Sequence, residues 1–176
     1  LPFPVDKACA PALEWVPFMQ DLNRERLTVT GLNGERYALE IDGRRVAETT
    51  AAALARGINL AELPDTPQYK QASQIRQWVS ERALIEGRKL RTLDHIEFLF
   101  LADRTNRTPD SDRAYLESKL VELTGKDNVW HRYRAGVIKN YFDLLPEQDA
   151  LRWRSAELTK SIRDNVAYGP RLLGVK

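Results

Sequence analysis

The chain has 176 residues, of which 43% are hydrophobic and 30% are charged, a composition typical of a folded globular protein. Its 27 basic and 25 acidic residues leave a formal charge of +2, which is too small an excess to favour nonspecific nucleic-acid binding. No run of about 18 apolar residues occurs, so the sequence predicts no nucleic-acid partner and no membrane span.

Cysteine and histidine content limits the possible metal and disulfide sites. Cys9 is the only cysteine, so neither an internal disulfide framework nor a cysteine-based zinc site can form within the chain. The two histidines show no H-x-x-x-H or H-E-x-x-H spacing, and there is no glycine-rich phosphate loop, so we expect no metal and no cofactor. The sequence starts at Leu1 without methionine or a signal segment, which suggests a processed or truncated product of a longer precursor.

Residues 1–25 are predicted to form an extended proline-rich strap and a short helix. Proline fixes φ and biases the preceding residue toward extended geometry. The strap holds four of the nine prolines, namely Pro2, Pro4, Pro11 and Pro17. A stripe of apolar residues from Pro11 to Leu22 favours a short helix that Pro17 would interrupt. We expect the strap to pack onto another surface.

Residues 26–64 are predicted to form an antiparallel β-meander and a short helix. Apolar and polar residues alternate over about 26–31, 35–41 and 44–49, as they do in half-buried strands. Asn33-Gly34 and Asp42-Gly43 are turn dipeptides, because these residues accept the positive φ of tight hairpins. Thr49 or Thr50 is expected to cap a helix through Ala55, which Gly57 ends.

Residues 65–176 are predicted to be a helical region. Asp65-Thr66-Pro67 starts a long helix that reaches about Asp103 unless Gly87 breaks it. Thr108-Pro109 repeats this start for a helix that Gly125 ends, and further helices are expected at about 127–144 and 146–167. The predicted fold class is α+β, with a small antiparallel β-meander followed by a mostly helical carboxy-terminal half.

The serines lack the sequence context of a catalytic nucleophile. A serine hydrolase places its nucleophile on a sharp turn beside oxyanion donors, and neither G-x-S-x-G nor G-D-S occurs here. The serines all fall in predicted helices or their first turns, where a solvated helix residue is the expected role. They are Ser73, Ser80, Ser111, Ser118, Ser155 and Ser161. We therefore predict no catalytic residue in this chain.

The two histidines are also poorly placed for catalysis. His95 follows Asp94 on a predicted helix, where adjacent side chains point about 100 degrees apart, so the carboxylate cannot easily orient the ring. His131 lies one turn after Asp127, a spacing that favours a helix-stabilising pair. A standalone hydrolase that uses His131 with a helical serine therefore ranks last.

Two further patterns have structural explanations that we prefer. Trp130-His131-Arg132-Tyr133-Arg134 and Arg152-Trp153-Arg154 interleave bases with aromatics, as nucleic-acid and carbohydrate binders do. Helices that pack their aromatic faces while the arginines reach water explain the same pattern. Asn106-Arg107-Thr108 is a glycosylation sequon, but Thr108 before Pro109 is better explained as a helix cap.

An ordered set of segments in the amino-terminal half resembles a known family. The segments are Leu1-Pro2-Phe3-Pro4-Val5-Asp6, Leu27-Thr28-Val29-Thr30-Gly31-Leu32, Tyr37-Ala38-Leu39-Glu40-Ile41-Asp42-Gly43, Ala55-Arg56-Gly57-Ile58-Asn59-Leu60-Ala61, and Thr66-Pro67 with Gln71-Ala72. They are similar to the tail of bacterial SGNH/GDSL-type hydrolases, in which such segments follow the α/β catalytic domain. The helices expected from 108 to 167 match no ending of that family.

The resemblance implies a parent esterase that is periplasmic or extracellular and acts on an acylated carbohydrate or another small ester. The family's Gly-Asp-Ser block, its Gly and Asn oxyanion donors and its Asp-x-x-His block precede the matched region and have no counterpart in this sequence. We therefore expect an accessory or carboxy-terminal portion of a GDSL-type serine ester hydrolase. Its partner would be an SGNH-type catalytic domain, on an upstream segment or a separate chain. The alternative is a helical protein-interaction or assembly module with no catalytic role.

Overall fold

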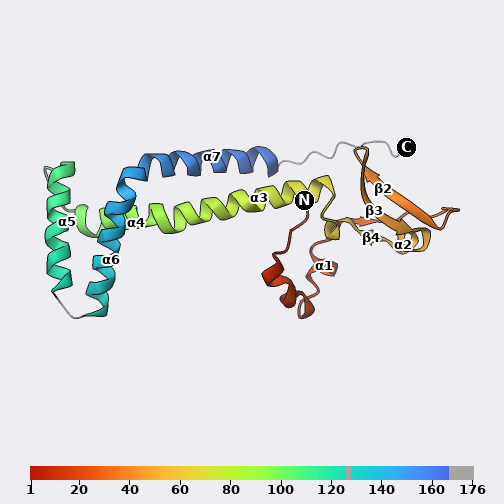
Figure 1. Cartoon of the computed structure of the whole chain (residues 1–176), viewed down its shortest axis with the longest axis horizontal. Helices are drawn as coiled ribbons and strands as arrows, with labels where there is room; N and C mark the ends of the chain where they lie inside the picture. Colours follow the sequence, from red (N-terminus) through yellow and green to blue (C-terminus); the bar gives the residue numbers. More distant parts are fainter. Residues whose placement is uncertain (126–127, 167–176) are drawn as a thin grey trace. The chain divides into compact units, whose positions relative to one another are not determined.

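The computed structural model describes residues 1–125 and 128–166 (Figure 1). These residues divide into two compact units, one made of Leu1–Val79 with the described residues from Ser161 onward, the other of Ser80–Lys160. Two small antiparallel strand pairs near the amino terminus are followed along the chain by long helices. The predicted α+β class is thereby confirmed, and the expected boundaries near residues 25 and 64 stay predictions.

The strap is less extended than its prolines suggest. A 3-10 helix, η1 (Lys7–Glu14), starts where the Asp6 carboxylate accepts a hydrogen bond from the Ala8 backbone N–H at 3.0 Å. The prediction of extended chain as far as Pro17 is wrong for η1, because the φ that proline fixes also fits a 3-10 helix. The predicted interruption at Pro17 is confirmed, since α1 (Phe18–Asp21) starts directly after it.

The hairpin of β2 (Arg36–Ile41) and β3 (Arg44–Thr50) follows the predicted pattern. Alternate β2 side chains are exposed and half-buried, as expected for a strand with one covered face. The connecting turn has positive φ at both central residues, 53° at Asp42 and 72° at Gly43. These values fit the type I′ turn that this dipeptide favours.

The predicted three-stranded meander is wrong in its first strand. β1 (Arg26–Leu27) is shorter than expected and pairs with β4 (Ile58–Asn59), which comes later in the chain. Asn33-Gly34 forms no tight hairpin, and Gly34 instead donates its backbone N–H to the Tyr37 hydroxyl at 2.5 Å. Because no turn reverses the chain at that point, β1 is free to take a distant partner.

Two predicted helix starts in the amino-terminal half are confirmed. The Thr50 hydroxyl caps α2 (Ala51–Arg56) by accepting from the Ala53 N–H at 3.1 Å, and Gly57 ends the helix with a φ of 93°. A 3-10 turn, η2 (Leu60–Glu62), follows β4. The buried Thr66 then starts α3 (Pro67–Leu84), because its hydroxyl accepts from the Tyr69 N–H at 3.3 Å.

The long helix continues past Gly87 instead of breaking there. α3 is followed without a gap by a π-helical segment, η3 (Ile85–Leu90), then α4 (Arg91–Ile96) and a second π segment, η4 (Glu97–Leu101). Gly87 lies inside η3, where the wider winding accommodates it. The helix therefore ends at Leu101, close to the predicted position.

The remaining helices match the predicted starts and ends. They are α5 (Pro109–Thr124), α6 (Val129–Leu144), the 3-10 turn η5 (Leu145–Glu147) and α7 (Gln148–Val166). Asp127 and residue 167, which the predicted helices included, lie outside the described residues. α5 and α6 lie side by side as a helical hairpin (Figure 1). No described helix combines the length and the apolar character that crossing a bilayer requires.

The helical unit contains a closely packed apolar core. Its side chains with at most 1% of their surface exposed come from α4, η4, α5, α6 and α7. They are Leu93, Ile96, Leu101, Leu116, Ile138 and Leu158. This core fixes the α5–α6 hairpin, and the loop before the hairpin carries a cluster of ion pairs.

Candidate functional site

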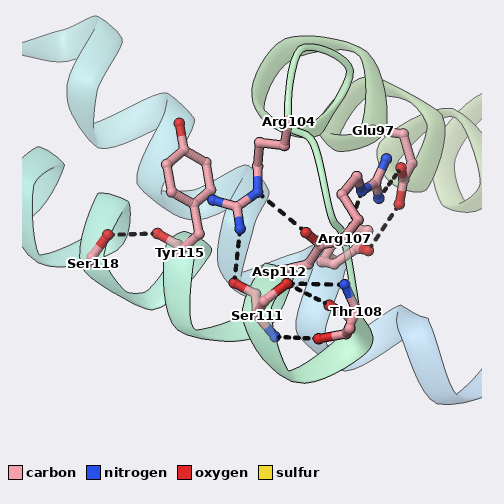
Figure 2. Close-up of polar contacts among 9 residues, drawn as sticks. Glu97, Arg104, Arg107, Thr108, Ser111, Asp112, Tyr115 and Ser118 are labelled. Atoms are coloured by element: carbon pink, nitrogen blue, oxygen red, sulfur yellow. Dashed lines mark hydrogen bonds and ion pairs between the residues drawn. The ribbon is translucent and has the colours of Figure 1, made fainter.

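A cluster of ion pairs surrounds Asp112 at the start of α5. Its two carboxylate oxygens accept hydrogen bonds from Arg104 Nε at 3.2 Å and from Arg107 Nε at 2.8 Å. Arg107 also donates to Glu97 of η4, with 2.7 Å between Nη2 and Oε2. Figure 2 shows that the two arginines come from the loop and converge on the carboxylate. Asp112 is only 9% exposed, so these pairs are partly shielded from water.

Local sequence determines this geometry. Thr108 and Ser111 form a capping box in which each side chain accepts from the other's backbone N–H, at 3.1 and 2.9 Å (Figure 2). Asn106 adopts a positive φ of 55°, a left-handed conformation that asparagine accepts more readily than most residues. Asp112 then lies in the first turn of α5, where the helix dipole favours a carboxylate. The predicted role of Thr108 as a cap is confirmed.

Tyr141 of α6 extends the cluster from the opposite side. Its hydroxyl donates to Glu97 Oε1 at 3.1 Å. Burial, followed by the negative charge of Glu97, raises the pKa of Tyr141 to about 12. Hydrogen bonds to Glu97 and Asp112 raise the pKa of Arg107, so the arginine stays charged. Tyr141 is thus held as a neutral donor, the opposite of an activated nucleophile.

A surface pocket of about 480 Å³ opens beside this cluster. Its lining residues are Glu97, Arg107, Thr108, Pro109, Asp112, Arg113, Tyr141, Phe142 and Leu145. Arg107 is paired with Glu97 and Asp112, and Arg113 with Glu117, so the pocket's guanidinium groups are already engaged by carboxylates. The arrangement is suited to fixing the loop onto α5, because the Thr108 hydroxyl belongs to the capping box and the Tyr141 hydroxyl donates to Glu97.

The serines occupy helical positions, as predicted. Ser111 belongs to the capping box, and Ser118 donates its hydroxyl to the Tyr115 carbonyl at 2.7 Å. Ser155 is buried and donates to Glu86 Oε1 at 2.6 Å. Ser73, Ser80 and Ser161 lie within α3 or α7. All six serines therefore lie on helical backbone, whereas a serine nucleophile is typically carried on a sharp turn.

The histidines lie in different surroundings. His95 lines a pocket of about 240 Å³ with Arg91, Thr92 and Tyr133 among its walls. His131 has a buried Nδ1 with no hydrogen-bond partner among the described residues, and the predicted partner Asp127 lies outside them. Thr92, which lines the same pocket as His95, donates its hydroxyl to the Arg88 carbonyl at 2.7 Å. The described part of the chain also groups no three potential metal ligands. The absence of a catalytic residue stays a prediction.

The aromatic residues that alternate with arginines in α6 and α7 are exposed. Trp130 is 70% exposed, Tyr133 56% and Trp153 67%, so the interpretation of a packed aromatic face is wrong for these rings. Trp130 and Tyr133 stack edge to face with 6.5 Å between ring centroids. The helical unit therefore presents large aromatic surfaces to solvent.

Sequence reasoning missed the side-chain role of Asn59. Its Oδ1 accepts from the backbone N–H groups of Glu25 at 2.9 Å and Ala61 at 3.2 Å. Its Nδ2 donates to the carbonyls of Asn23 at 2.9 Å and Met19 at 3.3 Å. Asn59 belongs to a segment that resembles SGNH/GDSL tails. Local spacing nevertheless cannot predict hydrogen-bond partners that lie more than 30 residues away.

Comparison with known proteins gives one informative similarity. No protein-family model and no curated protein matches the chain at a significant level. The chain is similar to the solved structure of BT4096, a gut microbial diltiazem-metabolizing enzyme, with 30% sequence identity and a TM-score of 0.69. The match covers 94% of this chain and 38% of that enzyme. The chain therefore resembles a portion of a microbial enzyme, and most of that enzyme's length lies outside the match.

Proposed function

We propose that this chain is the accessory portion of an SGNH/GDSL-type serine ester hydrolase and that it braces a catalytic portion carried elsewhere. The observation that carries the proposal is the similarity of nearly the whole chain, 94%, to only 38% of a microbial enzyme. A portion of that size supports association with a further part that performs the chemistry.

The chemistry of the side chains supports an accessory role. The Ser111, Ser118 and Ser155 hydroxyls are engaged in caps or helix contacts. Tyr141 has a raised pKa and is therefore less reactive as a nucleophile than an ordinary tyrosine. The ordered segments from Leu1 to Ala72 resemble SGNH/GDSL tails and therefore support ester hydrolysis as the reaction class. An acylated carbohydrate or small-ester substrate and a periplasmic or extracellular location belong to the same proposal.

A second candidate function is a helical assembly module. The exposed Trp130, Tyr133 and Trp153 in the helical unit favour it, because large exposed aromatics are enriched in protein interfaces. In that case, copies of the chain would associate through residues 66–166, and no catalytic partner would be needed.

Cross-linking mass spectrometry of the protein purified from its own source separates the two candidates. The accessory role predicts cross-links from residues 1–49 to a polypeptide that carries a Gly-Asp-Ser turn. The assembly role predicts cross-links among copies of residues 66–166 instead. A purified sample that contains this chain alone, folded and monomeric, would contradict the accessory role.

A further inference from the structure

The strap, residues 1–25, exposes several large apolar side chains. Trp15 is 87% exposed, Leu22 74% and Phe3 68%. None of the residues of η1 or α1 is buried. Exposed apolar surface of this kind is typical of protein-interaction sites where it is contiguous, and these three side chains all fall within residues 1–25.

Polar contacts nevertheless hold the strap in one conformation. Asn23, 2% exposed, accepts from the Phe3 N–H at 2.8 Å and donates to the Phe3 carbonyl at 3.0 Å. Asn59 donates its Nδ2 to the Asn23 carbonyl at 2.9 Å. Arg76 of α3 forms an ion pair with Asp6, with 2.9 Å between Nη1 and Oδ2. The strap is thus ordered by hydrogen bonds to its own unit, while Phe3, Trp15 and Leu22 remain exposed. Such preorganisation reduces the entropy lost on binding.

An apolar pocket lies beside the exposed ring of Phe3. It has a volume of about 310 Å³ and is lined by Phe3, Val5, Leu13, Met19, Ala61, Glu62 and Tyr69. Six of these side chains offer carbon surface or an aromatic ring, and Glu62 is the single carboxylate. The pocket therefore suits an apolar side chain that a partner inserts. Conversely, Trp15 and Leu22 can insert into pockets on the partner and act as anchors there.

We propose that the strap is the docking surface for the catalytic portion, with Phe3, Trp15 and Leu22 as anchors and with Asn23 and Asn59 as positioning residues. This inference rests on the proposed function. The occupant is an apolar surface of that portion, because the similar enzyme has most of its length outside the match and so contains the polypeptide needed to cover the strap.

Hydroxyl-radical footprinting compares Trp15 with Trp153, which is 67% exposed on α7 and serves as the matched control. The measurement is made on the chain alone and on the protein that holds both portions. We expect both indoles to be oxidised readily in the chain alone. In the complete protein, Trp15 should become several-fold less reactive while Trp153 keeps its rate.

Three outcomes would overturn the proposal. Equal reactivity of Trp15 in the two samples contradicts docking through the strap. Equal protection of both indoles contradicts a surface specific to the strap. Protection of Trp15 in the chain alone that grows with concentration assigns the surface to a second copy.

Labelling the complete protein with a fluorophosphonate in the same experiment keeps the two proposals distinguishable. A labelled serine outside this chain with a reactive Trp15 leaves the proposed function standing and removes the docking surface. A protected Trp15 without any labelled serine keeps the strap as an interface but removes a serine hydrolase as its occupant.

Discussion

The strap and the helical unit differ in what holds each of them together. The helical unit of Ser80–Lys160 buries a set of aliphatic side chains from five of its segments, which is the usual source of stability for a self-sufficient fold. The strap buries only Pro2 and Asn23, and side-chain hydrogen bonds fix its path. The comparison teaches that one region carries its own core, whereas the other leaves large apolar side chains exposed, as the proposed docking requires.

Removing a core side chain from the helical unit should have the largest effect. Leu116 of α5 is fully buried, so Leu116→Ala should lower the free energy of unfolding by about 2–5 kcal/mol through lost burial and a residual cavity. Val121→Ala in the same helix is the control, because Val121 is 73% exposed and its truncation should cost less than about 0.5 kcal/mol. Denaturant unfolding followed by far-ultraviolet circular dichroism measures both. Similar losses for the two variants would contradict the assigned core.

Removing Asn59 should have a smaller and more local effect. Asn59→Ala leaves the Glu25 N–H and the Asn23 carbonyl without their partner, which should cost about 2–3 kcal/mol in the amino-terminal unit. Hydrogen exchange should speed up at the amides of Phe3, Glu25 and Ala61, and helical amides in α5 should keep their protection. Asn33→Ala, at an exposed asparagine, is the matched control. Unchanged exchange in the strap would show that its order has another origin.

Tyr141 should make the helical unit sensitive to alkaline pH, with the smallest effect of the three. Its pKa is about 12 in the fold against an ordinary value of about 10, so the folded state favours the neutral phenol. The resulting stability is complete below about pH 10 and is lost as pH rises toward 12, by on the order of 1–3 kcal/mol. Tyr141→Phe should flatten the fall in denaturant midpoint between pH 9 and about 11.5. An equally steep fall in the variant would rule Tyr141 out as its cause.

Helix starts were predictable because their signals are local. Thr50, Thr66 and Thr108 each accept from a backbone N–H three residues later, and the adjacent residues identify them. The Asp42-Gly43 turn was equally predictable, since positive φ is a property of the dipeptide.

The missed features depend on contacts between distant residues. In β1, Arg26 pairs with Asn59 and Leu27 with Ile58, and no alternation pattern within 26–31 encodes such distant partners. The ion pairs of Asp112 were also missed, because only the folded loop brings Arg104 and Arg107 to one carboxylate. Similarly, the exposure of Trp130 and Trp153 follows from how the helices pack, which composition alone does not specify.

Active-site labelling with a fluorophosphonate, followed by peptide mass spectrometry of the complete protein, tests the central claim most directly. The account predicts that the phosphonyl group is attached to a serine outside the sequence from Leu1 to Lys176 and that this chain alone stays unlabelled. Covalent modification of any of its own hydroxyls, such as Ser155 or Ser111, would contradict the accessory role.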